Sequence, residues 1–143
     1  MKQQTLAKSF SLEGVGLHTG KTVIIEFEPA EVNHGIRFMR VDMQDQPVLT
    51  ADVNQVVSTN RGTTIRNGEA QISTVEHVLS ALTGTGVDNV LIKVNGPEIP
   101  IMDGSAMDFV DGILGAGLLE QGTDREYFEI EEINSLNRRE QEI

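Results

Sequence analysis

The chain has 143 residues, which fits a single domain with a hydrophobic core of its own. Its 22 acidic and 11 basic residues give a formal net charge of -11, so we expect neither nucleic acid nor an anionic lipid surface as a partner. Cysteine is absent, which excludes disulfides, thiol catalysis and cysteine-ligated zinc, and leaves His, Asp, Glu and water as ligands for any metal ion.

No segment has the composition of a targeting or membrane-spanning element. The first ten residues, "MKQQTLAKSF", lack a signal-peptide core, and no run approaches the roughly 20 apolar residues of a membrane span. We therefore expect a protein that is not transmembrane and that lies in the cytoplasm.

The predicted strands are apolar or β-branched runs bounded by Gly, Pro, Asn or Asp. They cover residues 5–17, 22–30, 35–41, 62–72, 88–96 and 125–133. In the fourth run the Asn67-Gly68 pair favours positive φ at both positions of a turn, which predicts a hairpin from Thr63 to Ile72.

Two segments show the 3.6-residue period of a helix. The apolar stripe of "STVEHVLSAL" comprises Val75, Val78, Leu79 and Leu82, and that of "SAMDFVDGILGAGL" comprises Ala106, Phe109, Val110, Ile113 and Leu114. Each segment begins with a Ser followed three residues later by an acid, the pattern of a capping box. The boxes pair Ser73 with Glu76 and Ser105 with Asp108, and Gly84 and Gly115 suit the helix ends.

Because strands outnumber helices and each helix needs a face to cover, we predict an α+β fold. Its expected form is a two-layer sandwich of one mostly antiparallel sheet of about five strands, with two helices on one face. Residues 1–130 form the predicted domain. Residues 131–143 lose apolar periodicity, which indicates a tail or the truncated start of a linker.

The glycine-rich "GVGLHTGKT" does not have the spacing of a phosphate-binding P-loop. That motif needs four residues between its first glycine and its Gly-Lys pair. Here five residues separate Gly14 from Gly20, and three separate Gly16 from Gly20. The following "TVIIEFE" also predicts a strand, where a P-loop requires a helix. We predict a tight turn between two strands, with His18 at its tip.

The adjacent pair Glu76 and His77 has two interpretations. In one, Glu76 completes a capping box and His77 is a solvated side chain. In the other, His77 binds a metal ion and Glu76 deprotonates a water held there. A zincin is excluded, because Ala81 stands where its second histidine would fall. The "PEIPIMDGSA" segment is equally open to a structural interpretation, since its prolines and Met-Asp-Gly turn stiffen the chain.

Several segments together resemble one family, in order and in spacing. They are "GVGLHTGK", "STVEHVLSAL" followed by "GVDNVLIKVNGPEIPIMDGSA", and "FVDGILGAG". They resemble the amino-terminal half of the zinc-dependent UDP-3-O-acyl-N-acetylglucosamine deacetylases of bacterial lipid A biosynthesis, from about Thr5 to about Ile130. The resemblance implies a hydrolase that removes the N-acetyl group of this UDP-sugar with the help of zinc.

The resemblance also implies roles for particular residues. Glu76 is the expected general base and His77 a zinc ligand. His18 is expected near the substrate's diphosphate, and Asp103 near the active site or in a turn-fixing role. The looser match of "STNRGT" places Thr59, Asn60 and Arg61 at the rim of the substrate site.

The family's other zinc ligands, a His and an Asp, come from a second domain that follows residue 130. The histidines of this chain, His18, His34 and His77, do not replace them. We therefore expect the 143-residue chain to be inactive alone, to bind zinc weakly, and to have the missing carboxy-terminal domain as its partner. The alternative is a non-catalytic α+β module that docks to another protein.

Overall fold

The computed structural model describes residues 1–58 and 62–125 of the chain. Its largest sheet has five strands in the order β2-β3-β9-β4-β5. These strands are β2 (Phe10–Val15), β3 (Thr22–Pro29), β9 (Val90–Val94), β4 (Ile36–Arg40) and β5 (Val48–Thr50). Neighbouring strands are antiparallel except β9 and β4, which are parallel. The prediction of one mostly antiparallel sheet of about five strands is confirmed.

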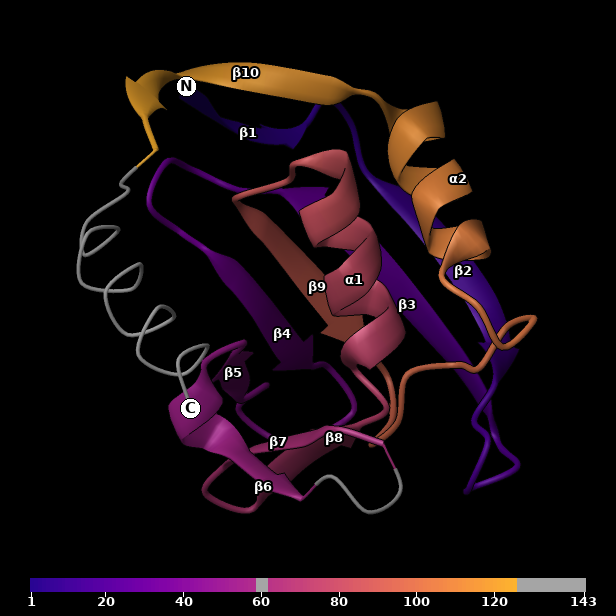
Figure 1. The fold of residues 1–143 in the computed structure, drawn as a ribbon. Coiled ribbons are helices and arrows are strands. Elements are labelled where there is room, and N and C mark those ends of the chain that lie inside the picture. The colour runs from indigo at the N-terminus through magenta and orange to yellow at the C-terminus, as the bar shows by residue number, and fades with distance from the viewer. Residues whose placement is uncertain (59–61, 126–143) are drawn as a thin grey trace, which may run out of the picture.

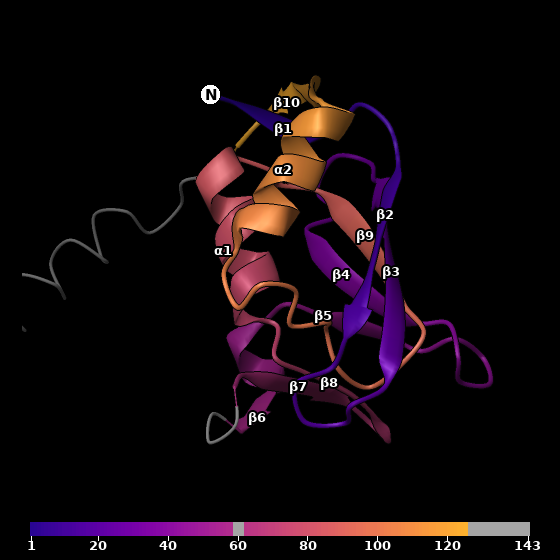
Figure 2. The ribbon, with the colours of Figure 1, turned by 90° about the vertical axis from the view of Figure 1, so that its right-hand side faces the viewer.

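Two helices pack side by side on one face of this sheet (Figures 1 and 2). They are α1 (Glu76–Thr85) and α2 (Met107–Ala116). Between the layers lie the fully buried rings of Phe27 and Phe38 from the sheet and Phe109 from α2. On β3 buried and more exposed positions alternate, as expected for a sheet covered on one face only. The two-layer α+β architecture is confirmed.

Two smaller sheets lie at opposite ends of the main sheet (Figure 1). One pairs β1 (Lys2–Leu6) with β10 (Leu118–Asp124), and the other contains β6 (Val56–Ser58), β7 (Thr64–Asn67) and β8 (Ala70–Ser73), preceded by a 3₁₀ turn, η1 (Val53–Gln55). The single strand predicted for residues 5–17 is wrong, because β1 and β2 join different sheets. The strand predicted for residues 125–133 and the tail at 131–143 lie, apart from Arg125, outside the described residues.

The predicted hairpin is present as β7 and β8, but its turn is displaced by one residue. Asn67 pairs with Ala70, so the two-residue loop is Gly68 and Glu69. Of the two, Gly68 has a positive φ of 62°. A glycine with positive φ at the first loop position is the pattern of a type II′ turn, and the expected positive φ at Asn67 is wrong.

Both predicted helices are present, and most of their apolar stripes are buried. Val75, Val78 and Leu82 are fully buried at α1, whereas Leu114 on α2 is 58% exposed and is not a core residue. The helices also extend past the predicted glycine stops. Gly86, with a φ of 85°, and Gly117 follow the last residues of α1 and α2, so Gly84 and Gly115 lie inside the helices.

The predicted capping boxes are wrong. The N-cap positions are Val75 and Ala106, and neither makes a side-chain capping bond. Ser73 is instead the last residue of β8, and its hydroxyl accepts a hydrogen bond from that of Thr64. Ser105 does accept from the N–H of Met107, at 3.2 Å, one residue earlier than a capping box requires.

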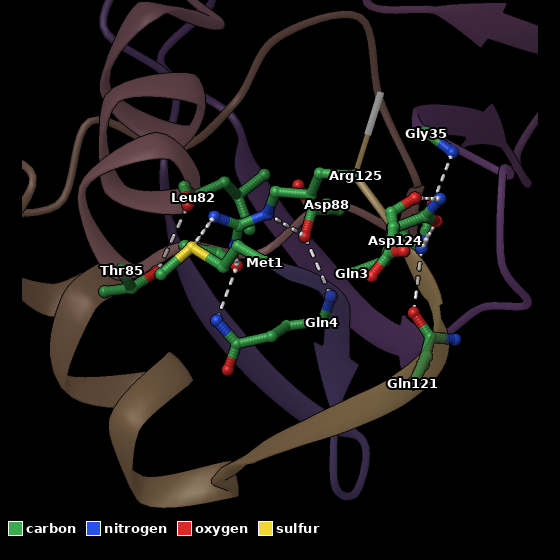
Figure 3. Close-up of polar contacts among 12 residues, drawn as sticks. Met1, Gln3, Gln4, Gly35, Leu82, Thr85, Asp88, Gln121, Asp124 and Arg125 are labelled. Atoms are coloured by element: carbon green, nitrogen blue, oxygen red, sulfur yellow. Dashed lines mark hydrogen bonds and ion pairs between the residues drawn. The ribbon is translucent and has the colours of Figure 1, made fainter. Parts of the chain in front are cut away.

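The β1–β10 pair is attached to the main sheet by side-chain amides that meet at Asn89, which is 1% exposed. Figure 3 labels three residues that bond to it, Gln3, Gly35 and Gln121. The Asn89 Nδ2 group donates to the Oε1 atoms of Gln3 and Gln121, both at 2.8 Å. Its Oδ1 accepts from the N–H of Gly35 at 2.8 Å. Side chains from β1 and β10 therefore share one polar centre with the loop before β4.

The close contact of α2 with β2 requires a glycine at position 112. Phe10 stacks on Phe27 with ring centroids 4.4 Å apart, and a Cβ at Gly112 would overlap the Phe10 ring. We expect Gly112→Ala to lower the free energy of unfolding by about 1–3 kcal/mol. At Gly115, in the same helix, an added Cβ would have no atom within 4 Å. Gly115→Ala is therefore expected to raise the free energy of unfolding by about 0.4–1 kcal/mol. Urea unfolding measures both, and equal effects would contradict this packing.

Candidate active site

The segments singled out from the sequence meet at the end of the sheet where β2 turns into β3. Gly16 forms a bridge with Pro100, and Ser73 forms one with Glu98. The N–H of Ile101 donates to the Val15 carbonyl at 2.9 Å. The glycine-rich turn, the start of α1 and the "PEIPIMDG" loop are therefore neighbours, although they are far apart in the sequence.

Glu98 is the buried acid at the centre of this arrangement, with 1% of its surface exposed. Its Oε2 accepts from the N–H of His18 at 3.0 Å, and its Oε1 accepts from the N–H of Thr19 at 3.1 Å. The hydroxyl of Thr74 also donates to Oε2, at 3.3 Å. Burial raises the pKa of the Glu98 carboxyl, but the hydrogen bonds from His18 and Thr19 outweigh it and hold this pKa below its usual value.

The glycines of "GVG" permit this close approach. A Cβ at Gly16 would overlap the Oε1 atom of Glu98, and one at Gly14 would lie 2.8 Å from the sulfur of Met102. The chain then turns directly into β3, since Val15 pairs with Thr22. The predicted tight turn is confirmed, and its glycines serve contact with the "PEIPIMDG" loop.

Glu76, the first residue of α1, is half-buried and held by the chain that precedes β7. Its Oε2 accepts from the N–H of Thr63 at 2.9 Å. The Thr63 carbonyl in turn accepts from the N–H of Val75 at 3.3 Å. Gly62 has a φ of 90°, and a Cβ there would lie 2.9 Å from the Glu76 Oε1 atom. The carboxylate is thus fixed by contacts other than the predicted capping box.

His77 is half-buried beside Glu76, and the nearby Asp103 precedes α2. The Asp103 Oδ1 atom accepts from the hydroxyl of Ser105 at 2.7 Å and from its N–H at 2.9 Å. These bonds, and to a smaller extent His77, lower the pKa of the Asp103 carboxyl. Asp103 therefore both fixes the turn before α2 and lies within the electrostatic reach of His77.

Two residues next to these side chains have unusual backbone conformations. Thr74, two positions before Glu76, has a φ of 65°, and Met102, next to Asp103, has a φ of 55°. Positive φ is rare for residues with a Cβ, and most of all for a β-branched one. Such conformations persist where surrounding contacts impose them, and they gather at functional sites.

The remaining predicted site residues have different outcomes. His18 lies exposed on the β2–β3 turn, and its backbone N–H is bound to Glu98. Thr59, Asn60 and Arg61 lie outside the described residues, between β6 and Gly62. Sequence reasoning missed Glu98; its signal was a single acid inside the otherwise apolar run "PEIPIM".

Within residues 1–58 and 62–125, no group of three or more His, Asp or Glu side chains is placed to hold a metal ion. A catalytic zinc site uses three protein ligands. The described residues alone therefore do not form one, and His77 offers a single imidazole.

Over residues 3–143 the chain matches the family model described as LpxC, UDP-3-O-acyl N-acetylglycosamine deacetylase. The chain belongs to this deacetylase family. The resemblance noted in the sequence is thereby confirmed.

Three relatives illustrate the similarity to known deacetylases. The bifunctional enzyme LpxC/FabZ of Porphyromonas gingivalis is 50% identical over 127 residues, covering 89% of this chain and 28% of the relative. UDP-3-O-acyl-N-acetylglucosamine deacetylases of Psychrobacter sp. and Legionella pneumophila are 46% and 48% identical over 130 residues, covering 91% of this chain and 44% and 43% of the relatives. The chain thus spans less than half the length of these relatives.

Among the described residues of this family member, neither helix is long and apolar enough to cross a membrane.

Proposed function

We propose that the full-length protein is a zinc-dependent deacetylase that hydrolyses the N-acetyl group of UDP-3-O-acyl-N-acetylglucosamine in lipid A biosynthesis, in the cytoplasm. This chain supplies the amino-terminal part of its active site. The observation that supports the proposal most is the family match, which extends over nearly the whole chain. The clustering of the matching motifs at one end of the sheet supports it further.

In this proposal Glu76 is the general base. Its Oε2 atom is anchored by the N–H of Thr63, while the described residues offer no hydrogen-bond donor to Oε1. Oε1 can therefore take the proton of a water that attacks the acetamide carbonyl. A base positioned in this way contributes about 10²–10⁴-fold to a rate.

His77 is proposed as one zinc ligand, adjacent to that base. When bound, the ion supplies Lewis acidity toward the acetamide carbonyl and favours ionisation of water. The remaining ligands have to come from the part of the protein that follows residue 130, which makes the carboxy-terminal domain the proposed partner. Residues 131–143 then begin the connection to it.

The other family-implied residues are proposed to contact the substrate. His18 is on an exposed turn whose backbone is fixed by Glu98, which suits contact with the diphosphate. The segment that contains Thr59, Asn60 and Arg61 is joined directly to Gly62, whose φ of 90° brings the chain against Glu76. Asp103 is proposed to act from the turn before α2, within reach of the charge of His77.

The test compares the full-length protein with the 143-residue chain. With UDP-3-O-acyl-N-acetylglucosamine as substrate, the full-length protein is expected to release acetate and to contain one zinc ion per molecule. The chain alone is expected to release none and to give no stoichiometric zinc binding in a calorimetric titration, because one histidine is not a three-ligand site.

Each part of the proposal fails on a different result. An inactive full-length, zinc-loaded protein would refute the deacetylase function. Stoichiometric zinc binding by the 143-residue chain would show that its ligand set is complete without the second domain, and would refute the shared site.

A further inference from the structure

We propose that Glu98 is a positioning residue, which locks the His18 turn to the segment that leads into α1 and so sets where His18 lies relative to Glu76 and His77. This inference rests on the proposed deacetylase function. It assigns Glu98 no contact with substrate or metal.

The contacts of Glu98 come from two sides. On one side its carboxylate accepts from the backbone N–H groups of His18 and Thr19, at 3.0–3.2 Å. On the other it accepts from the hydroxyl of Thr74 at 3.3 Å. Because Thr74 is two residues before Glu76, one side chain joins the tip of the β2–β3 turn to the start of α1.

The backbone around Glu98 strengthens this link. The Ser73 N–H donates to the Pro97 carbonyl at 2.8 Å, and the Ile99 N–H donates to the Ser73 carbonyl at 3.0 Å. These two bonds hold the chain just before Thr74, and the Glu98 carboxylate then holds the Thr74 hydroxyl. The φ of 65° at Thr74 is a costly conformation for a β-branched residue, and these contacts impose it.

Burial makes a purely stabilising role a poor explanation for this carboxylate. A charged group with 1% exposure carries a large desolvation cost, which hydrogen bonds have to offset. Within the part of the chain that the structure describes, the carboxylate accepts hydrogen bonds from the turn and from Thr74, and none from a strand of the main sheet. Loss of these hydrogen bonds is therefore expected to change the geometry of the site more than the packing of the hydrophobic core.

The decisive variant is Glu98→Gln in the full-length protein. The amide keeps the shape, but its NH₂ group cannot accept from an N–H, so the bonds to His18 and Thr19 cannot all persist. We expect kcat per folded molecule to fall roughly 100-fold, the cost of a displacement of about 1 Å. Zinc content is expected to stay at the wild-type level, because no proposed ligand is changed.

Three companion variants separate positioning from other effects. Thr74→Val removes the hydroxyl and keeps the shape, and is expected to lower kcat about tenfold. Glu98→Asp keeps the charge on a shorter side chain and is expected to restore part of the kcat lost in Glu98→Gln. Glu13→Gln, on the exposed side of β2, makes the same charge change outside the site and is expected to leave kcat unchanged.

The outcomes are distinguishable. An inactive wild-type protein refutes the proposed function itself. If the wild type is active and the kcat of Glu98→Gln is within about threefold of the wild-type value, the positioning role is overturned. It is also overturned if activity falls only in proportion to the folded fraction, measured by circular dichroism. If Glu98→Gln does not fold, Glu98→Asp and Thr74→Val decide by the same criterion, and wild-type kcat in both overturns the inference.

Discussion

Glu76→Gln in the full-length protein is expected to lower kcat by about 10³-fold while zinc stays bound. The change removes the proton acceptor. It keeps an oxygen that can accept the hydrogen bond from the Thr63 N–H, which is 2.9 Å long in the unchanged protein. The Gly62–Thr63 segment therefore keeps its position, and the loss of rate reports the missing base alone. The measurement is steady-state acetate release, with zinc content determined on the same samples.

Two further variants make this result specific. His77→Ala is expected to lose both zinc and turnover, because it removes a proposed ligand. Glu76→Ala also releases the Thr63 N–H, so it is expected to be no more active than Glu76→Gln. Turnover of Glu76→Gln within threefold of the wild type would show that Glu76 is not the general base.

The sequence predicts β3, β4, β9 and both helices because their signals are local. Apolar residues alternate along β3 and follow the 3.6-residue period along α1, and each pattern is complete within one segment. The pairing of β1 with β10 has no such signal. These strands are more than 100 residues apart, and β10, "LLEQGTD", is largely polar. A strand of this kind is defined by its partner and not by its own composition.

The capping boxes fail for a related reason. A Ser and a Glu three residues apart fit the local pattern, yet the Glu76 carboxylate accepts from Thr63, 13 residues earlier in the chain. Glu98 was missed in the same way, because its partners His18 and Thr19 are 80 and 79 residues away. Contacts between residues so far apart in the sequence follow from the fold, so patterns within one short segment do not predict them.

The family resemblance, in contrast, assigns proposed roles to Glu76 and His77, which physical patterns left open. Spacing alone did not separate a solvated His77 from a ligand. The described structure adds that Ser105, and to a smaller extent His77, lowers the pKa of the Asp103 carboxyl, and that Glu76 is held by a backbone N–H. Both observations are compatible with catalysis, and the roles themselves stay predictions until the variants above are measured.

The buried amide centre at Asn89 shows which part of the fold depends on polar contacts. Asn89 fills the space between Gln3 of β1, Gln121 of β10 and the Gly35 N–H before β4, and its donors and acceptor all have partners. The Thr5 hydroxyl also donates to the Asn89 carbonyl, at 2.6 Å. A fully satisfied network of this kind rigidifies a structure, whereas a half-satisfied one is costly.

Asn89→Ala is therefore expected to lower the free energy of unfolding by about 2 kcal/mol or more, since it removes the partner of the half-buried Gly35 N–H and of the Gln121 Oε1 atom, at about 1–3 kcal/mol each. The Gln3 Oε1 atom keeps its hydrogen bond from the Asn33 N–H at 2.9 Å. Asn95→Ala is the matched control, because the Asn95 Oδ1 atom accepts a single hydrogen bond, from the Ile24 N–H at 2.9 Å, at an exposed position. Its expected cost is about 0.5–1.5 kcal/mol. Urea unfolding of both variants checks the difference. Equal costs would mean that the structure relaxes around Asn89, and that the β1–β10 pair is held by the apolar contacts of Leu6 instead, which is fully buried.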